Sequence, residues 1–118
     1  VALGTDKLIM VERSTRQTKL YQVATLRNGT NLLDSRWDEE KTYPSLEMLS
    51  NLVTQGITAI DKKLVFNSAS ELPTLDANIE GLAVLSDEFV AFINDNGFGI
   101  KGDKTRITIR KLVRQLRQ

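Results

Sequence analysis

Two short stretches of this chain carry residue types and spacings that enzymes use. The loop GFGIKG, residues 97–102, matches the G-x-G-x-x-G pattern with which dinucleotide-binding folds approach a pyrophosphate. That chemistry needs a strand before the loop and a helix after it, so that the helix N-terminus faces the phosphates. The surrounding residues predict a helix before the loop and a strand after it. This order favours a helix cap and turn over cofactor binding.

The second stretch is Asp61–Lys63, which follows the apolar segment ITAI and is similar to the acid-x-lysine strand of metal-dependent nucleases. In such enzymes paired carboxylates hold Mg²⁺ and the lysine stabilises the attacked phosphate, so Asp34 or Asp38 would be the second ligand. Another such tripeptide occurs at residues 39–41, and 15 acidic and 16 basic residues produce about that many by chance. A solvated turn is the simpler interpretation, and a small Mg²⁺ nuclease is the third functional alternative.

Histidine and cysteine are both absent from the 118 residues. Their absence excludes Ser-His-Asp and Cys-His catalysis, proton transfer by imidazole, disulfides, and metal sites built from thiolate or imidazole. We therefore expect a protein that is not an enzyme, with no catalytic residue, no metal site and no cofactor.

The length and composition of the sequence are those of an ordinary globular protein. Hydrophobic residues make up 41% and charged residues 26% of the sequence, and 118 residues fit one domain with a real core. No apolar run approaches the roughly 20 residues that a membrane span needs, and the N-terminus lacks the pattern of a signal peptide. We expect a single soluble domain over residues 1–118 that is neither bound to a membrane nor secreted by a signal peptide.

The first 35 residues predict an antiparallel β-meander. The segments KLIMVER (residues 7–13) and KLYQVATLR (19–27) flank the polar STRQT, which is typical of a hairpin with a five-residue loop. Asn28-Gly29 then favours a tight turn, and TNLL (30–33) returns as a third strand.

Two helices and further strands are predicted beyond the meander. Pro44 and Ser45 open a helix over residues 45–55 that Gly56 ends, and Ser86 caps a helix over residues 87–95. The remaining apolar segments predict strands, at 57–61, 63–66, 79–85 and 105–110. The fold class is therefore α+β: a single small domain with a β-meander, two short helices, and a C-terminal strand that runs into a basic helix.

Charge is distributed unevenly along the chain. Residues 61–100 carry two basic and seven acidic side chains, whereas residues 101–118 carry seven basic side chains and one acidic one. A protein that binds nucleic acid usually has a positive balance over the whole domain. We therefore expect the basic tail to lie against the acidic middle segment, in the same subunit or a neighbouring one, and a nucleic-acid-binding arm is the alternative.

The C-terminal segment combines apolar and basic residues. Ile107 and Ile109 alternate with Arg106, Thr108 and Arg110, so a strand here is expected to have one core face and one basic face. Residues 111–118 predict a short helix with a narrow apolar stripe, too short to be stable alone, which must dock on another surface. An acidic protein surface would match both the stripe and the charges.

The N-terminal hairpin resembles one found in structural proteins of tailed phages, cyanophages especially. The matching residues share an acidic start, an apolar strand ending at arginine, and a YQV motif: Asp6, Leu8, Ile9, Val11, Arg13, Tyr21 and Val23. The resemblance covers about the first 27 residues and implies a virion component of the tail, neck or capsid surface.

These observations together predict a noncatalytic structural or assembly protein in a virion or the host cytoplasm. Its expected partners are other protein subunits, in a homo-oligomer or a larger assembly, and a nucleic-acid-binding accessory role is the second alternative. The apolar hairpin strands and the C-terminal segment supply the candidate contact residues: Leu8, Met10, Tyr21, Val23, Arg110, Lys111, Leu112, Val113, Arg114, Leu116 and Arg117.

Overall fold

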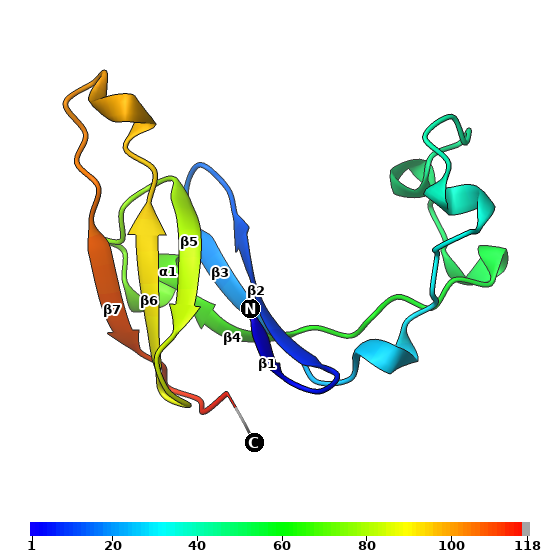
Figure 1. Ribbon diagram of the computed structural model, residues 1–118, viewed down its shortest axis with the longest axis horizontal. Helices are drawn as coiled ribbons and strands as arrows, with labels where there is room; N and C mark the ends of the chain where they lie inside the picture. Colours follow the sequence, from blue (N-terminus) through cyan, green and yellow to red (C-terminus); the bar gives the residue numbers. More distant parts are fainter. Residues whose placement is uncertain (117–118) are drawn as a thin grey trace.

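The computed structural model describes residues 1–116 and is mostly β, with two antiparallel sheets (Figure 1). The first sheet has four strands in the order β1 (Ala2–Gly4), β2 (Lys7–Arg13), β3 (Thr18–Val23) and β4 (Lys63–Asn67). The second sheet has three strands in the order β5 (Ile79–Val84), β6 (Phe89–Asn94) and β7 (Ile107–Lys111). Within the described residues the single α-helix is α1 (Ser68–Glu71). No helix in this part of the chain is both long and apolar enough to cross a membrane.

The predicted hairpin of β2 and β3 is confirmed. Met10 pairs with Tyr21 and Val11 with Leu20, and the connection spans residues 14–17, closed by a hydrogen bond from the Ser14 amide to the Gln17 carbonyl. The third strand of the meander is β1, which precedes β2. The strand predicted at residues 30–33 is wrong, because that segment leaves the sheet.

The hydrophobic core lies between the two sheets. Ile9 and Leu20 of the first sheet and Val90 of the second are fully buried, and the rings of Phe66 and Phe92 lie 5.4 Å apart across the interface. Each such side chain contributes about 1.5–3 kcal/mol by leaving water. The two sheets therefore form one packed sandwich.

The helix predicted over residues 87–95 is wrong, because this segment is β6. The Ser86 hydroxyl does accept hydrogen bonds from the amides of Glu88 and Phe89, at 3.2 Å each, as a helix cap would. These bonds instead close the turn between β5 and β6, where the Phe89 carbonyl accepts from the Leu85 amide. Beyond the turn, burial alternates with the period of two that a strand requires.

The helix predicted over residues 45–55 is also wrong. Two 3₁₀ turns, Leu46–Met48 and Val53–Gln55, lie there instead. The Asn51 side chain accepts a hydrogen bond from the Val53 amide at 3.0 Å, and so competes with the backbone carbonyls that would continue a helix. Gly56 ends the second turn in the left-handed conformation, with φ of 71°, as expected of a C-terminal glycine. The segments predicted as strands at 63–66, 79–85 and 105–110 are confirmed, whereas residues 57–61 form no strand.

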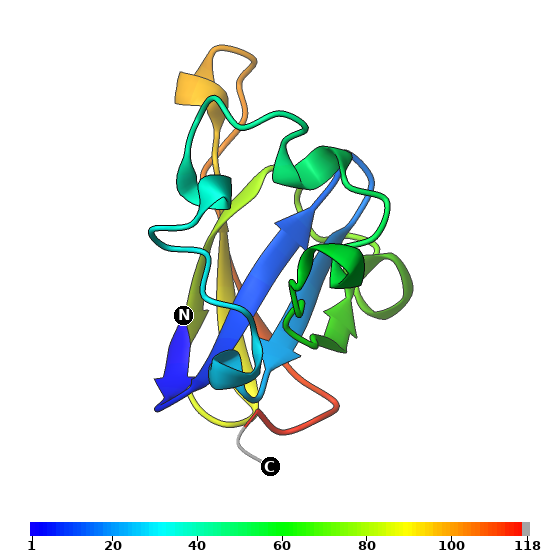
Figure 2. The ribbon, with the colours of Figure 1, turned by 90° about the vertical axis from the view of Figure 1, so that its right-hand side faces the viewer.

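The molecule is extended for its length. Its radius of gyration is 17.0 Å, whereas a compact chain of this size has about 13.5 Å. Its accessible surface is 8515 Å², against about 6400 Å² for a typical monomer of this mass. The cause is residues 30–58, here called the arm, which project from the first sheet in Figure 1 and face the viewer in Figure 2.

Candidate interaction surfaces

The outer face of the second sheet is apolar and exposed. Cross-strand pairing puts Gly81, Ile93 and Ile107 side by side, and likewise Ala83, Ala91 and Ile109. Phe89 lies on the same side, opposite Lys111. We call this surface the apolar face; it comprises Gly81, Ala83, Phe89, Ala91, Ile93, Ile107 and Ile109. Ile107 and Ile109 are 69% and 61% exposed, so their hydrophobic surface has no cover within the described chain.

The orientation of β7 is opposite to the one predicted from sequence. Thr108 and Arg110, expected on a basic outer face, point inward opposite Phe92 and Val90. The alternation continues to Leu112, which is buried in the core. Burying Leu112 therefore turns Ile107 and Ile109 outward, and the aliphatic stem of Arg110 fills the inner position. The Arg110 Nε is buried without a hydrogen-bond partner in the described structure.

The arm is tied together at its base and exposes large apolar side chains to solvent. The Thr30 amide donates to the Thr58 carbonyl at 3.0 Å, and the Thr58 amide donates to the Thr30 hydroxyl at 2.8 Å. Ile57 is the buried residue of the arm. Four large apolar side chains of the arm are exposed to solvent: Leu33, Tyr43, Met48 and Val53.

The arm is acidic. It contains five carboxylates, Asp34, Asp38, Glu39, Glu40 and Glu47, against two basic residues. None of the five forms an ion pair with another residue in the described part of the chain. Hydrogen bonds from its own backbone amide and from Ser45 lower the pKa of Glu47 below its ordinary value, which keeps that carboxylate charged. The arm thus presents uncompensated negative charge beside exposed apolar groups.

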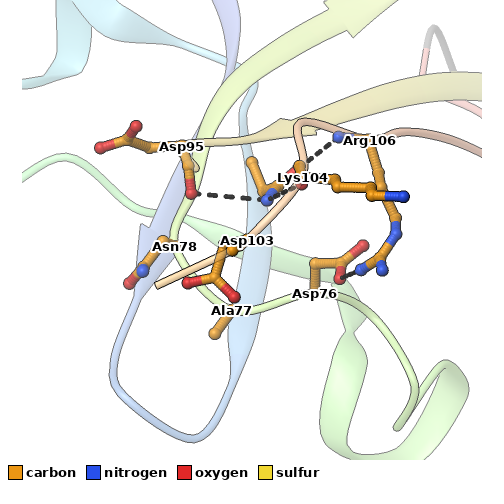
Figure 3. A pocket seen from close by; sticks show the side chains of 9 residues that line it. Asp76, Ala77, Asn78, Asp95, Asp103, Lys104 and Arg106 are labelled. Carbon is orange, nitrogen blue, oxygen red and sulfur yellow. Dashed lines mark hydrogen bonds and ion pairs between the residues drawn. The ribbon is translucent and has the colours of Figure 1, made fainter. Parts of the chain in front are cut away.

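A polar cluster fixes the loop between β6 and β7 (Figure 3). The buried Asn94 side chain accepts a hydrogen bond from the Arg106 amide at 2.6 Å and donates to the Lys104 carbonyl at 3.1 Å. Asp95 accepts from the Gly97 amide at 2.9 Å, and Arg106 pairs with Asp76. These hydrogen bonds and the ion pair between Arg106 and Asp76 hold the loop in place.

The loop itself, residues 95–105, contains the GFGIKG motif between two strands. Phe98 is 95% exposed, with φ of 60°, and Ile100 is also exposed. A strand precedes the loop, contrary to the predicted helix, but a strand also follows it. The loop therefore opens no helix toward a phosphate, and it presents two apolar side chains to solvent.

Two of the C-terminal basic residues pair with the acidic middle segment, as predicted. Arg106 pairs with Asp76, and Lys111 with Glu88 at 3.2 Å. Hydrogen bonds from Gln115 and Lys111, together with the positive charge of Lys111, lower the pKa of Glu88 below its usual value. This part of the basic tail therefore lies on its own subunit.

The helix predicted over residues 111–118 does not form over residues 111–116. Lys111 ends β7, and Leu112 and Leu116 are buried in the core of the same chain. The Leu112 amide donates to the Glu88 carbonyl at 2.7 Å, and the Leu116 amide to the Asp87 carbonyl at 2.9 Å. The acidic surface expected for this segment is thus the turn between β5 and β6. Val113 and Arg114 are exposed, and Arg117 lies outside the described residues.

The predicted contact residues of the hairpin lie on the outer face of the first sheet. Leu8, Met10 and Tyr21 are half-buried, and Val23 is buried. The Lys62 ammonium lies 4.5 Å from the centre of the Tyr21 ring and pairs with Glu12. The chain itself covers part of this face, and its role in contacts stays a prediction.

The acidic residues considered for a nuclease lie on separate segments. Asp61 is exposed just before β4, and its neighbour Lys62 pairs with Glu12, while Asp34 and Asp38 belong to the arm. Across residues 1–116 no three acidic side chains gather in a way that would hold a metal ion.

Sequence reasoning did not identify Tyr43 on the arm or Phe98 on the loop as candidate contact residues. The signal was present: isolated large apolar residues within polar, glycine-rich or proline-containing stretches, as in KTYPS and NGFGIKG. Such residues have no amphipathic periodicity, so no helix or strand can bury them as a set.

Comparisons with models of known protein families, with curated proteins and with solved structures gave no match.

Proposed function

We propose that this chain is a noncatalytic structural subunit that works through protein–protein contacts. The observation that carries the proposal is the excess surface. The molecule exposes about 2100 Å² more than a typical monomer of its mass, and large apolar side chains lie on that surface. A standard interface buries about 800 Å² per partner. The excess is therefore enough for more than one contact.

The exposed apolar side chains support a role in protein–protein contact, because an interface would remove them from water. Tyr43 on the arm, Phe98 on the loop and Ile107 on the apolar face are each more than two-thirds exposed. Covering apolar surface contributes about 25 cal/mol per Å². Aromatic and aliphatic residues concentrated on projections are typical of contact surfaces.

A tailed-phage particle is the proposed setting. This part of the proposal rests on the sequence of the N-terminal hairpin, which resembles one found in structural proteins of tailed phages. Asp6, Arg13 and Tyr21 are among the matching residues. Within such a particle the subunit would belong to the tail, neck or capsid surface.

A nucleic-acid-binding accessory role is the second candidate. Lys101, Lys104 and Arg114 have no ion-pair partner among residues 1–116, so their charges are available to phosphates. This role would leave the apolar surfaces unexplained, which is why it ranks second.

Size-exclusion chromatography with light scattering, run with and without duplex DNA, tests the proposal. We expect a mass of several subunits that depends on protein concentration and does not change with DNA. A chain that stays monomeric and binds DNA, with an affinity that falls steeply as salt rises, would contradict the structural role.

A further inference from the structure

We propose that the partner of the apolar face is the arm of a second copy of this chain. This inference rests on the proposed function and specifies it: the contact joins two different surfaces of identical subunits. One copy contributes the arm, and the next copy contributes the outer face of β5, β6 and β7.

The apolar parts of the two surfaces are complementary in kind. On the apolar face, Ile107 and Ile109 project beside the small residues Gly81, Ala83 and Ala91, which leave a shallow depression. On the arm, Tyr43 is 82% exposed and Met48 is also exposed. A projecting ring and a flexible thioether are the side chains that fill such a depression well.

The charges are complementary as well. The arm has two basic and five acidic residues, a net charge of −3, whereas the other described residues, 1–29 and 59–116, have a net charge of +3. In the described part of the chain the arm carboxylates form no ion pairs, and neither do Lys101 and Lys104 on the loop beside the apolar face. Opposite uncompensated charges favour this pairing and guide the encounter.

Charge also argues against pairing of two apolar faces. Such a symmetric contact would leave the arm carboxylates of both copies without opposite charge, because residues 79–111 carry five basic and five acidic side chains. A contact between arm and face brings the arm carboxylates close to Lys101 and Lys104.

The positions of the two surfaces exclude closure within one chain. The longest dimension of the molecule is 45 Å. The second sheet lies at one end of this axis and the arm at the other (Figure 1). Each copy can therefore offer its arm to one neighbour and its face to another. Repeating such a heterologous contact generates a ring if the rotation closes, and a filament if it does not.

Two variants of the full-length chain block one surface each. Ile107→Asp with Ile109→Asp puts carboxylates on the apolar face, and Tyr43→Lys with Met48→Lys puts ammonium groups on the arm. All four side chains are exposed, so folding should be unchanged, which circular dichroism and melting check. Val113→Asp is the matched control, because Val113 is 81% exposed and lies on neither surface.

Light scattering on each variant and on their mixture gives the test. We expect several-subunit assemblies for wild type and the control, and monomers for each blocked variant alone. Mixing the two variants leaves one intact face and one intact arm, so we expect a species of twice the mass of one chain and nothing larger.

The alternatives give different results. Monomers with the blocked face but assemblies with the blocked arm would show pairing of two faces, which overturns this inference and leaves the structural role standing. Loss of assembly in Val113→Asp alone would place the contact in the C-terminal segment and also overturn it. A wild-type chain that stays monomeric at high concentration overturns the inference, and DNA binding by that monomer would overturn the proposed function too.

Charge reversal provides an independent readout. Glu39→Lys with Glu40→Lys on the arm should weaken assembly, as should Lys101→Glu with Lys104→Glu on the loop. All four changes in one chain should restore assembly, because the two signs are exchanged. Assembly that is indifferent to these changes and to salt would contradict the pairing of arm and face.

Discussion

Ile93 lies directly over Gly81 on the outer face of the second sheet, so that a Cβ built on Gly81 would come within 2.0 Å of the Ile93 Cγ2. The two residues are cross-strand partners in β5 and β6. The missing side chain at position 81 lets Ile93 lean across the sheet, and this packing shapes the depression of the apolar face. The shape of the proposed contact surface therefore depends on one glycine.

This relationship predicts strong coupling between the two positions. Gly81→Ala should destabilise the fold by about 1–3 kcal/mol, because the new methyl group forces the stiff, β-branched Ile93 out of its position. Adding Ile93→Ala removes the obstructing methyl group, so the double variant should lose less than the sum of the single variants. Urea denaturation of all four proteins measures the coupling, and additive losses would show that the close approach does not exist.

The C-terminal segment should matter for stability. Leu116 is fully buried in the core, and Leu116→Ala should reduce the free energy of unfolding by about 2–5 kcal/mol through lost burial and a cavity. Val113→Ala, three residues earlier and exposed, should change it by less than about 0.5 kcal/mol. Equal, small effects of both changes in chemical denaturation would mean that the segment does not pack on the sandwich.

The loop between β6 and β7 should depend on the Asn94 amide. Asn94→Ala removes the acceptor for the Arg106 amide and the donor to the Lys104 carbonyl, so the loop should open and unfolding should become about 1–3 kcal/mol easier. Hydrogen exchange at the Arg106 amide should accelerate while the Leu20 amide, in β3, stays protected. Unchanged exchange at Arg106 would contradict the anchoring role.

The turn between β1 and β2 should contribute stability that depends on pH. Partial burial raises the pKa of Asp6, but hydrogen bonds from the Arg27 side chain and amide outweigh it and leave the pKa below its ordinary value. A lowered pKa in the folded state means that the stabilisation is fully present above the unfolded value of about 3.9 and is lost as pH falls through the folded value. Asp6→Asn should therefore flatten the acid limb of a stability profile between pH 6 and about 2. A profile identical to that of wild type would count against this ion pair.

Sequence patterns correctly predicted the pairing of strands that are adjacent in sequence, but they did not predict structure that depends on distant segments. The hairpin of β2 and β3 could be found because its strands are adjacent and a short polar loop joins them. In β6, by contrast, Phe89, Phe92 and Ile93 fit a helical spacing while Val90 and Phe92 fit a strand spacing. This segment becomes a strand because it pairs with β5 and with β7, and β7 begins more than ten residues further along the chain. The local sequence pattern does not show which distant strand will pair with a segment.

The same dependence on distant segments explains why the orientation of β7 was predicted incorrectly. Two apolar sets compete for the inner side of the C-terminal strand, one containing Ile107 and Ile109 and the other containing Leu112 and Leu116. The hydrogen bonds from Leu112 and Leu116 to the turn at Asp87 and Glu88 favour the second set. Because that turn is distant in sequence, the outward direction of the isoleucines could not be deduced from their alternation alone.

The most direct test of the central claim is the sedimentation of the wild-type chain over a wide range of concentrations, compared with the chain carrying Ile107→Asp and Ile109→Asp. If the exposed apolar surface is a subunit contact, wild type sediments as a species that grows with concentration and the variant remains a folded monomer. Identical monomeric sedimentation of both proteins at every concentration would contradict the claim that this surface joins copies of the chain.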